Sequence, residues 1–125
     1  MIDRKSTEQC ADEVLTALEQ GQIEVMVGSL PGDAPGWDKW RPVIEQTAQQ
    51  MRHWRPSRDQ LLSRTQQQMR QFTDADGAYG SSFDVVARSL EEMCQMDFQH
   101  RLLAASVPRT IAADACYLLT VLLPV

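Results

Sequence analysis

Apolar residues recur at three- and four-residue steps along most of this chain, with polar residues between them. That spacing places the apolar side chains on one face of an amphipathic helix. Glycine, proline and small polar residues gather at 28–36 and 73–82, where they indicate loops. The pattern therefore predicts helices at 5–27, 83–107 and 110–123, and two further helices within 37–72.

Local signals place the beginnings of two of these helices. Ser6 with Gln9, and Ser57 with Gln60, have the form of a capping box, in which each residue's side chain bonds the other's backbone N–H. Pro56 disfavours helical geometry at the residue before it. We therefore expect a break near Pro56, with a new helix beginning after Ser57.

The stretch 23–27 fits two kinds of secondary structure. Ile23, Val25 and Val27 alternate along the chain as in a half-buried strand, whereas Ile23, Met26, Val27 and Leu30 fit a helix. The pattern offers no second strand with which this stretch would pair. We therefore favour helix, continuing the first helix through to residue 27, and keep strand as the alternative.

The last fifteen residues, from Ile111 to Val125, are apolar except for a few positions, and Asp114 is their one charged residue. A transmembrane helix needs about 20 apolar residues, so this segment is not expected to cross a membrane. A helix at 110–123 that is apolar nearly all round must be buried on every side. We place it at a homo-oligomer interface, formed by Tyr117, Leu118, Leu119 and Leu122.

Length and composition define the fold class. The chain has 125 residues, 43% of them apolar and 23% charged, which is typical of one globular domain and not of a disordered chain. With five predicted helices and no predicted strand pair, we expect an all-α, bundle-like single domain of four to five helices. Because a two-fold axis pairs identical patches, the terminal helix makes a homodimer the expected assembly.

Three cysteines, Cys10, Cys94 and Cys116, are widely spaced and include no CxxC pair. Neither a disulfide framework nor a zinc ribbon is predicted from them. The N-terminal residues lack the apolar stretch of a secretory signal, so, with these cysteines, we expect a cytoplasmic protein. The sequence contains no recognisable metal-binding or phosphate-binding motif, so we expect no cofactor. Cys94 and Cys116 fall on apolar stripes, where we expect buried, unreactive thiols.

The net charge of −5 is unevenly distributed. Residues 1–33 carry seven acids and two bases, 38–70 three acids and seven bases, and 74–125 seven acids and three bases. A basic segment between two acidic flanks attracts nucleic acid or an acidic partner, or is neutralised by the flanks within the protein or between subunits. We favour the last interpretation.

Candidate catalytic and metal-binding residues are few. His53 and His100 lie in no recognisable arrangement of nucleophile, base and orienting group. Asp97 and His100 lie one helical turn apart, as in carboxylate-bridged metal bundles, but the second such pair is missing, so we favour contacts of Asp97 with His100 or Arg101. The residues DADG at 74–77 do not complete a calcium loop. We therefore predict no enzyme and no metal site.

Three tryptophans accompany the arginines of the basic segment. Their register matches that of the apolar residues in 37–54, which favours core packing or anchoring at an interface over stacking on single-stranded nucleic acid. As candidate partner-binding residues we take Trp37, Trp40, Arg41, Trp54, Arg55 and Arg58. Nucleic-acid binding through 38–70 remains the alternative.

The segment from residue 89 to 103 reads SLEEMCQMDFQHRLL. It has a serine, an aliphatic residue and a glutamate before a glutamine and methionine pair, then a leucine-rich stretch, and a proline follows five residues after the segment. These positions are Ser89, Leu90, Glu91, Gln95, Met96, Leu102 and Pro108, and "SLP" at 29–31 precedes a long predicted helix. These features resemble those of the small helical antiactivators of the TraM family, which bind LuxR-type quorum-sensing receptors.

This resemblance covers about fifteen residues and implies a non-enzymatic helical dimer that occludes the DNA-binding or dimerisation surface of a transcription factor. Together with the residue patterns, it leads us to expect a small regulatory protein that binds and occludes another protein, with a transcriptional regulator as the implied partner. A nucleic-acid-binding protein that uses the segment 38–70 is the alternative.

Overall fold

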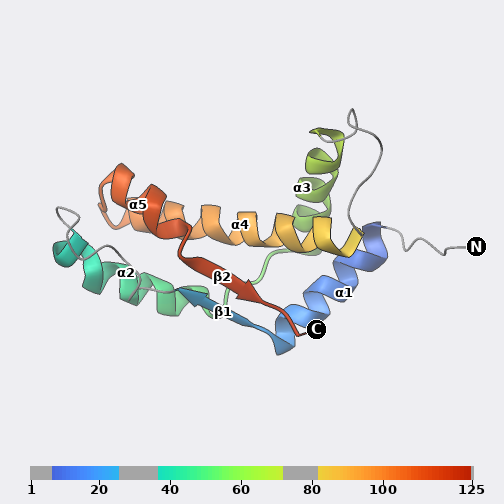
Figure 1. Cartoon of the computed structure of the whole chain (residues 1–125), viewed down its shortest axis with the longest axis horizontal. Coiled ribbons are helices and arrows are strands. Elements are labelled where there is room, and N and C mark those ends of the chain that lie inside the picture. The colour runs from blue at the N-terminus through green and yellow to red at the C-terminus, as the bar shows by residue number, and fades with distance from the viewer. Residues whose placement is uncertain (1–6, 26–36, 72–81, 125) are drawn as a thin grey trace, which may run out of the picture. The chain divides into compact units, whose positions relative to one another are not determined.

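The structure is a computed structural model that describes residues 7–25, 37–71 and 82–124 (Figure 1). The predicted loop at 28–36, nearly all of the one at 73–82 and the predicted helix start at Ser6 lie outside the described residues. In chain order the elements are α1 (Thr7–Gln20), β1 (Gln22–Val25), α2 (Trp37–Met51), α3 (Arg58–Gln71), α4 (Ser82–Ala104), α5 (Arg109–Cys116) and β2 (Leu119–Leu122). The expectation of a mostly helical protein is confirmed.

The first helix is shorter than the pattern predicted, because a strand follows it. α1 ends at Gln20, and β1 occupies Gln22–Val25, so the preferred helical interpretation of 23–27 is wrong for the residues described. Ile23 is buried while its neighbours Gln22 and Glu24 are exposed, which is the two-residue alternation of a strand with one covered face. The alternation visible in the sequence was therefore the better signal.

The partner strand comes from the other end of the chain. The predicted helix at 110–123 is wrong beyond Cys116, where α5 ends and the chain turns into β2. β1 and β2 pair antiparallel, with Gln22 opposite Leu122 and Val25 opposite Leu119 (Figure 1). Because a strand needs only one buried face, the C-terminal apolar residues do not all require burial, as a helix apolar all round would.

The chain divides into two compact units. The first consists of 1–21, 55–93 and 123–125, and the second of 22–54 and 94–122. In the first unit α1 packs against α3, and the buried side chains include Val14, Leu18, Leu61, Val86 and Leu90. In the second unit α2 lies against β1, and the buried side chains include Ile44, Met51, Phe98, Leu102 and Leu119. The expectation of a single domain stays a prediction.

The capping box predicted at the start of α3 is present. The backbone N–H of Gln60 donates to Ser57 Oγ at 3.1 Å, and the backbone N–H of Ser57 donates to Gln60 Oε1 at 3.4 Å. These two bonds satisfy donors that have no partner within the helix. The cap therefore fixes where the chain becomes helical again after Pro56, as the sequence predicted.

The end of α4 has the bonding pattern of a Schellman motif. The N–H of Ser106 donates to Leu103 O and the N–H of Val107 donates to Leu102 O, both at 3.0 Å. Ser106 adopts a φ of 70°, in the left-handed region that glycine usually occupies at this position. Val107 and Leu102, the residues whose side chains meet in such a motif, are both buried. The turn thus directs the chain into α5 at the cost of strain at Ser106.

Candidate functional site

Exposed apolar side chains are the most distinctive surface feature of the described residues. The large ones are Met96, which is 45% exposed, Tyr117 at 74% and Leu122 at 46%. All three belong to the second unit. Single exposed apolar residues are ordinary on protein surfaces, so their meaning depends on what surrounds them.

Tyr117 is exposed because it continues the outer face of α5. The buried residues of that helix are Ile111, Ala112, Ala115 and Cys116. Asp114 is exposed on the opposite face, and Tyr117, the helical C-cap residue, follows it by three positions. Residues three apart on a helix are surface neighbours, with about 5–6 Å between their Cβ atoms. An exposed aromatic ring therefore lies beside a carboxylate.

Leu122 lies on the outer face of the two-stranded sheet. Its partner in β1 is Gln22, and the partner of Thr120 is Glu24. Gln22 and Glu24 are both exposed. Glu24 is thus the diagonal neighbour of Leu122 on the same face, at a separation of about 7–8 Å. The second exposed apolar residue also has a carboxylate beside it. We call Asp114, Tyr117, Leu122 and Glu24 together the tail surface.

The inner face of β2 is anchored in the second unit. Leu119 is 1% exposed and stands opposite Val25 on the inner side of the sheet. Gln95, on α4, donates from Nε2 to Leu119 O at 3.5 Å. Of the predicted interface residues, the single chain therefore buries Leu119 and partly buries Leu118, while Tyr117 and Leu122 stay exposed. The interface assignment itself stays a prediction.

The three predicted partner-binding tryptophans lie in the second unit, and none of them is fully exposed. Trp37 is 5% exposed, while Trp40 and Trp54 are half-buried. The Nζ atom of Lys39 lies 5.5 Å from the centre of the Trp40 ring, within the range of a cation–π contact. Burial of Trp37 agrees with the core-packing interpretation of its helical register.

The three arginines predicted to bind a partner contact their own chain. In the second unit Arg41 lies 3.6 Å from Asp38. In the first unit Arg58 Nε donates to Asp12 Oδ1 at 2.7 Å, and Arg55 donates to a backbone carbonyl oxygen at 3.3 Å. The hydrogen bond from Arg58 to Asp12 and the charge of that carboxylate raise the pKa of Arg58. The six candidates are thus divided between the two units.

In the first unit, two arginines of the basic segment pair with acids from the two acidic flanks. Arg58, from the basic segment, pairs with Asp12 from the first acidic flank, and Arg64 pairs with Glu92 from the second, at 3.5 Å. Exposed pairs of this kind stabilise a protein little. Their consequence is that part of the basic segment is neutralised within the chain, as we favoured from the sequence.

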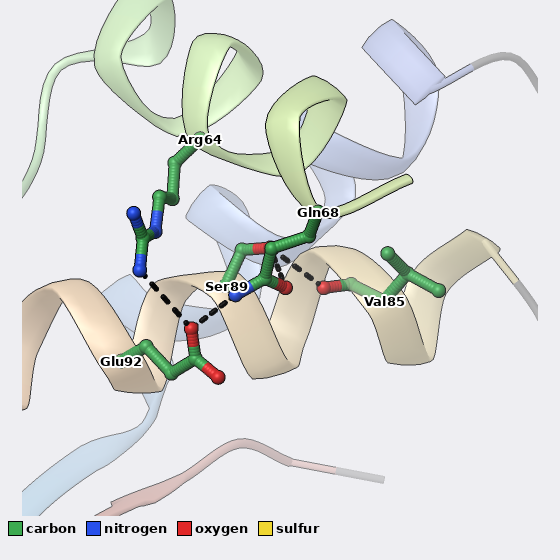
Figure 2. A network of polar contacts seen from close by, with 5 residues as sticks. All are labelled: Arg64, Gln68, Val85, Ser89 and Glu92. Carbon is green, nitrogen blue, oxygen red and sulfur yellow. Dashed lines mark hydrogen bonds and ion pairs between the residues drawn. The ribbon is translucent and has the colours of Figure 1, made fainter. Parts of the chain in front are cut away.

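A polar network joins α3 to the first half of α4, within the first unit (Figure 2). Ser89 Oγ lies 2.8 Å from Gln68 Oε1 and 3.0 Å from Val85 O, and Gln68 Nε2 donates to Glu92 Oε2. Arg64 also donates to this oxygen, at 3.5 Å. A carboxylate accepts but cannot donate, so the Gln68 amide must turn its nitrogen toward Glu92 and its oxygen toward the Ser89 hydroxyl.

The network holds α3 against α4 and has no feature of a binding or catalytic site. Ser89 is 0% exposed and Gln68 is 6% exposed, so both need partners inside the protein. The Nε atom of Arg64 is buried and has no hydrogen-bond partner among the described residues. Ser89 was named from the sequence only through the family resemblance, and Gln68 and Glu92 were missed. The glutamine-rich sequence of α3 is typical of a solvated face, and only its pairing with α4 reveals the network.

Possible chemistry elsewhere is limited in the described residues. His53 and His100 are both exposed, and Asp97 accepts from Arg101 Nε at 2.7 Å, one of the two contacts favoured from the sequence. No group of three or more potential ligands that could hold a metal occurs in this part of the chain.

An open surface hollow of about 460 Å³ in the first unit is lined by Asp12, Glu13, Thr16, Ala17, Gln20 and Pro124. None of the helices that the structure describes is long and apolar enough to span a membrane.

The three cysteines form no disulfide bond and are all buried. The expected burial of Cys94 and Cys116 is confirmed, and Cys10 is buried as well. Burial raises the pKa of the Cys116 thiol, and the nearby charge of Asp114 raises it further. The thiol donates to Ala113 O at 3.1 Å. A thiol held in its protonated form is a poor nucleophile, so Cys116 is a packing residue.

Comparison with known proteins gives no relative: no protein-family model, no curated protein and no solved structure matches this chain. The resemblance to the TraM family therefore rests on its residues alone. Of these residues, the structure buries Ser89, Leu90 and Leu102 and leaves Met96 exposed.

Proposed function

We propose that this chain is a cytoplasmic, non-enzymatic regulator that binds another protein and occludes one of its surfaces. The observation that carries the proposal is the exposure of Tyr117 and Leu122 on the tail surface. Tyrosine is enriched among the residues that dominate binding energies at protein interfaces, because it combines a large apolar ring with a polar end. Because Tyr117 is 74% exposed, its ring stabilises its own unit much less than it would stabilise an interface that buried it.

A transcriptional regulator is the partner class that we propose. The support is the resemblance of the segment from Ser89 to Leu103 to antiactivators of the TraM family, in which Met96 occupies the methionine position. Met96 is 45% exposed and belongs to the same unit as the tail surface, so it is available to a partner. We favour a protein partner over nucleic acid, because Arg41, Arg58 and Arg64 pair with acids of their own chain and these acids offset their attraction for phosphates.

The test compares complexes formed in the cells that naturally make the protein. Tagged wild-type chain is purified beside a Tyr117→Ser/Leu122→Ser double variant and a control variant, Gln49→Ser, which alters an exposed residue of α2. Native mass spectrometry should find one partner protein at a fixed stoichiometry with the wild type and the control, and little of it with the double variant. Absence of a stoichiometric partner, or equal recovery with all three proteins, would contradict the proposal.

A further inference from the structure

The tail surface combines two exposed apolar side chains with two carboxylates. Asp114 lies one helical turn before Tyr117, and Glu24 is the diagonal neighbour of Leu122 across the sheet. Both acids are exposed. Neither β1 nor the segment 110–125 contains a lysine or an arginine. The surface thus presents apolar anchors with negative charge beside each of them, and the nearest base in the sequence is Arg109 at the start of α5, five residues before Asp114.

The distance between the anchors limits the size of what can cover both. Tyr117 and Leu122 are five positions apart, so their Cα atoms are separated by at most about 18 Å. A helix of about 12 residues has the same length. One short amphipathic helix is therefore long enough to reach both anchors, with side chains at its margins near Asp114 and Glu24.

We infer that the tail surface receives a cationic amphipathic helix of the partner protein, an inference that rests on the function proposed above. Leucine-type side chains of that helix contact Tyr117 and Leu122, and lysine or arginine side chains at its margins meet Asp114 and Glu24. The net charge of −5 attracts such a helix at long range and speeds its association.

A second copy of this chain is a poorer occupant. A two-fold interface brings together the same patch from both copies. Pairing the tail surface with itself would gather Asp114 and Glu24 of each copy around one contact, and Arg109, at the other end of α5, is the nearest base in the sequence. Like charges at an interface disfavour association. We therefore assign the surface to a foreign partner, in place of the homodimer expected from the sequence.

The experiment measures binding of the full chain to a synthetic helical peptide of about 18 residues, with leucines on one face and lysines on the other. A peptide with glutamates in place of the lysines is the matched control. We expect the lysine peptide to bind at low salt, with an affinity that falls as salt is added, and the glutamate peptide to bind at least about 10-fold more weakly. Equal binding of the two peptides overturns the inference.

Variants locate the binding. Tyr117→Ser should weaken binding of the lysine peptide by about 10-fold or more, since it removes an anchor that is exposed and not needed for folding. Asp114→Asn and Glu24→Gln should each weaken it by about 2- to 5-fold at low salt. Glu45→Gln, which neutralises an exposed acid on α2, is the matched control and should change nothing. Equal effects of Glu45→Gln and the two tail-surface variants overturn the inference.

Two further outcomes separate this inference from the proposed function. If light scattering shows a wild-type dimer without peptide and a monomer for Tyr117→Ser, the occupant is a second copy and the inference fails. If the Tyr117→Ser/Leu122→Ser double variant loses its cellular partner while the wild-type chain binds neither peptide, the cationic helix is wrong and the proposed function stands. If the lysine peptide binds as expected but no cellular partner is recovered, the proposed function fails while the chemistry of the surface holds.

Discussion

Replacing Leu119 by alanine tests whether the C-terminal strand belongs to the core of its own unit. The side chain is 1% exposed, so the substitution removes three fully buried carbon atoms. At about 0.8 kcal/mol for each buried methylene-sized group, the transfer contribution is about 2.4 kcal/mol. The cavity left between β2 and its neighbours adds to this loss, and a total of about 3 kcal/mol lies within the range measured for buried leucines.

Leu122 provides a matched control on the same strand. It is also a leucine, it faces the outer side of the sheet, and it is 46% exposed. Leu122→Ala removes the same atoms, but about half of their surface is already in water and no closed cavity is left, so a loss of about 1 kcal/mol is expected. Urea unfolding followed by circular dichroism measures both free energies of unfolding at several protein concentrations.

The burial of Leu119 in its own unit would be contradicted by a comparable loss of stability for the two variants, or by a larger loss for Leu122→Ala. Either would mean that the face of β2 that we describe as inner is not the buried one. An unfolding midpoint that rises with protein concentration for the wild type but not for Leu119→Ala would show that Leu119 is buried by a second copy. We expect midpoints that do not depend on concentration.

Three other predictions follow from local geometry. Ser106→Gly should raise the free energy of unfolding by about 1 kcal/mol, measured by thermal denaturation, because glycine adopts the φ of 70° without strain, whereas Ser106→Ala should give no gain. Glu92→Ala should lower the free energy of urea unfolding by about 1–3 kcal/mol because it removes the acceptor of the buried Gln68 amide, and Glu92→Gln, which keeps an acceptor, should cost less. The raised pKa of Cys116 means that the folded state holds its proton at pH values where the unfolded chain releases it. Stability should therefore be complete below the ordinary thiol pKa of 9.0 and fall above it, and Cys116→Ala should show a smaller fall than the wild type between neutral and alkaline pH.

The helices could be predicted because their signals are local. The apolar spacing around Ile44 and Leu90, and the Ser57 cap with its glutamine three residues later, involve neighbours within one or two turns. These signals predicted α2, the start of α3 and α4. The ends of α1 and α5 were misplaced because the chain switches from helical to strand periodicity within two or three residues at both places.

The sheet could not be predicted from either strand alone. Residues 22–25 alternate, but a four-residue strand is convincing only when its partner is known, and that partner lies at the other end of the chain. The segment from Leu118 to Leu123 hides its alternation, because the outward position of Leu122 is filled by an apolar residue. The apolar residue at this outward position, Leu122, obscures the strand pattern in the sequence. It also makes the outer face of the sheet a candidate binding surface.

The candidate site was predicted in part. Tyr117 and Leu122 were named from the sequence as interface residues and are exposed, whereas Leu119 was named with them and is buried. Sequence alone could not distinguish these leucines, since the difference is a matter of strand register. Asp114 was known as a charge within the C-terminal segment, but its position beside Tyr117 follows from where α5 ends.

Site-specific photo-crosslinking can show whether the tail surface contacts a partner protein in the cell. The chain is expressed in the cells that naturally make it, with a photoreactive benzoylphenylalanine in place of Tyr117, and in a parallel sample in place of Gln49 on α2. Irradiation should give one adduct with a second protein from the Tyr117 position, through a segment rich in lysine or arginine, and none from the Gln49 position. An adduct of two copies of this chain, no adduct from Tyr117, or the same adducts from both positions would contradict the claim that the tail surface binds a partner protein.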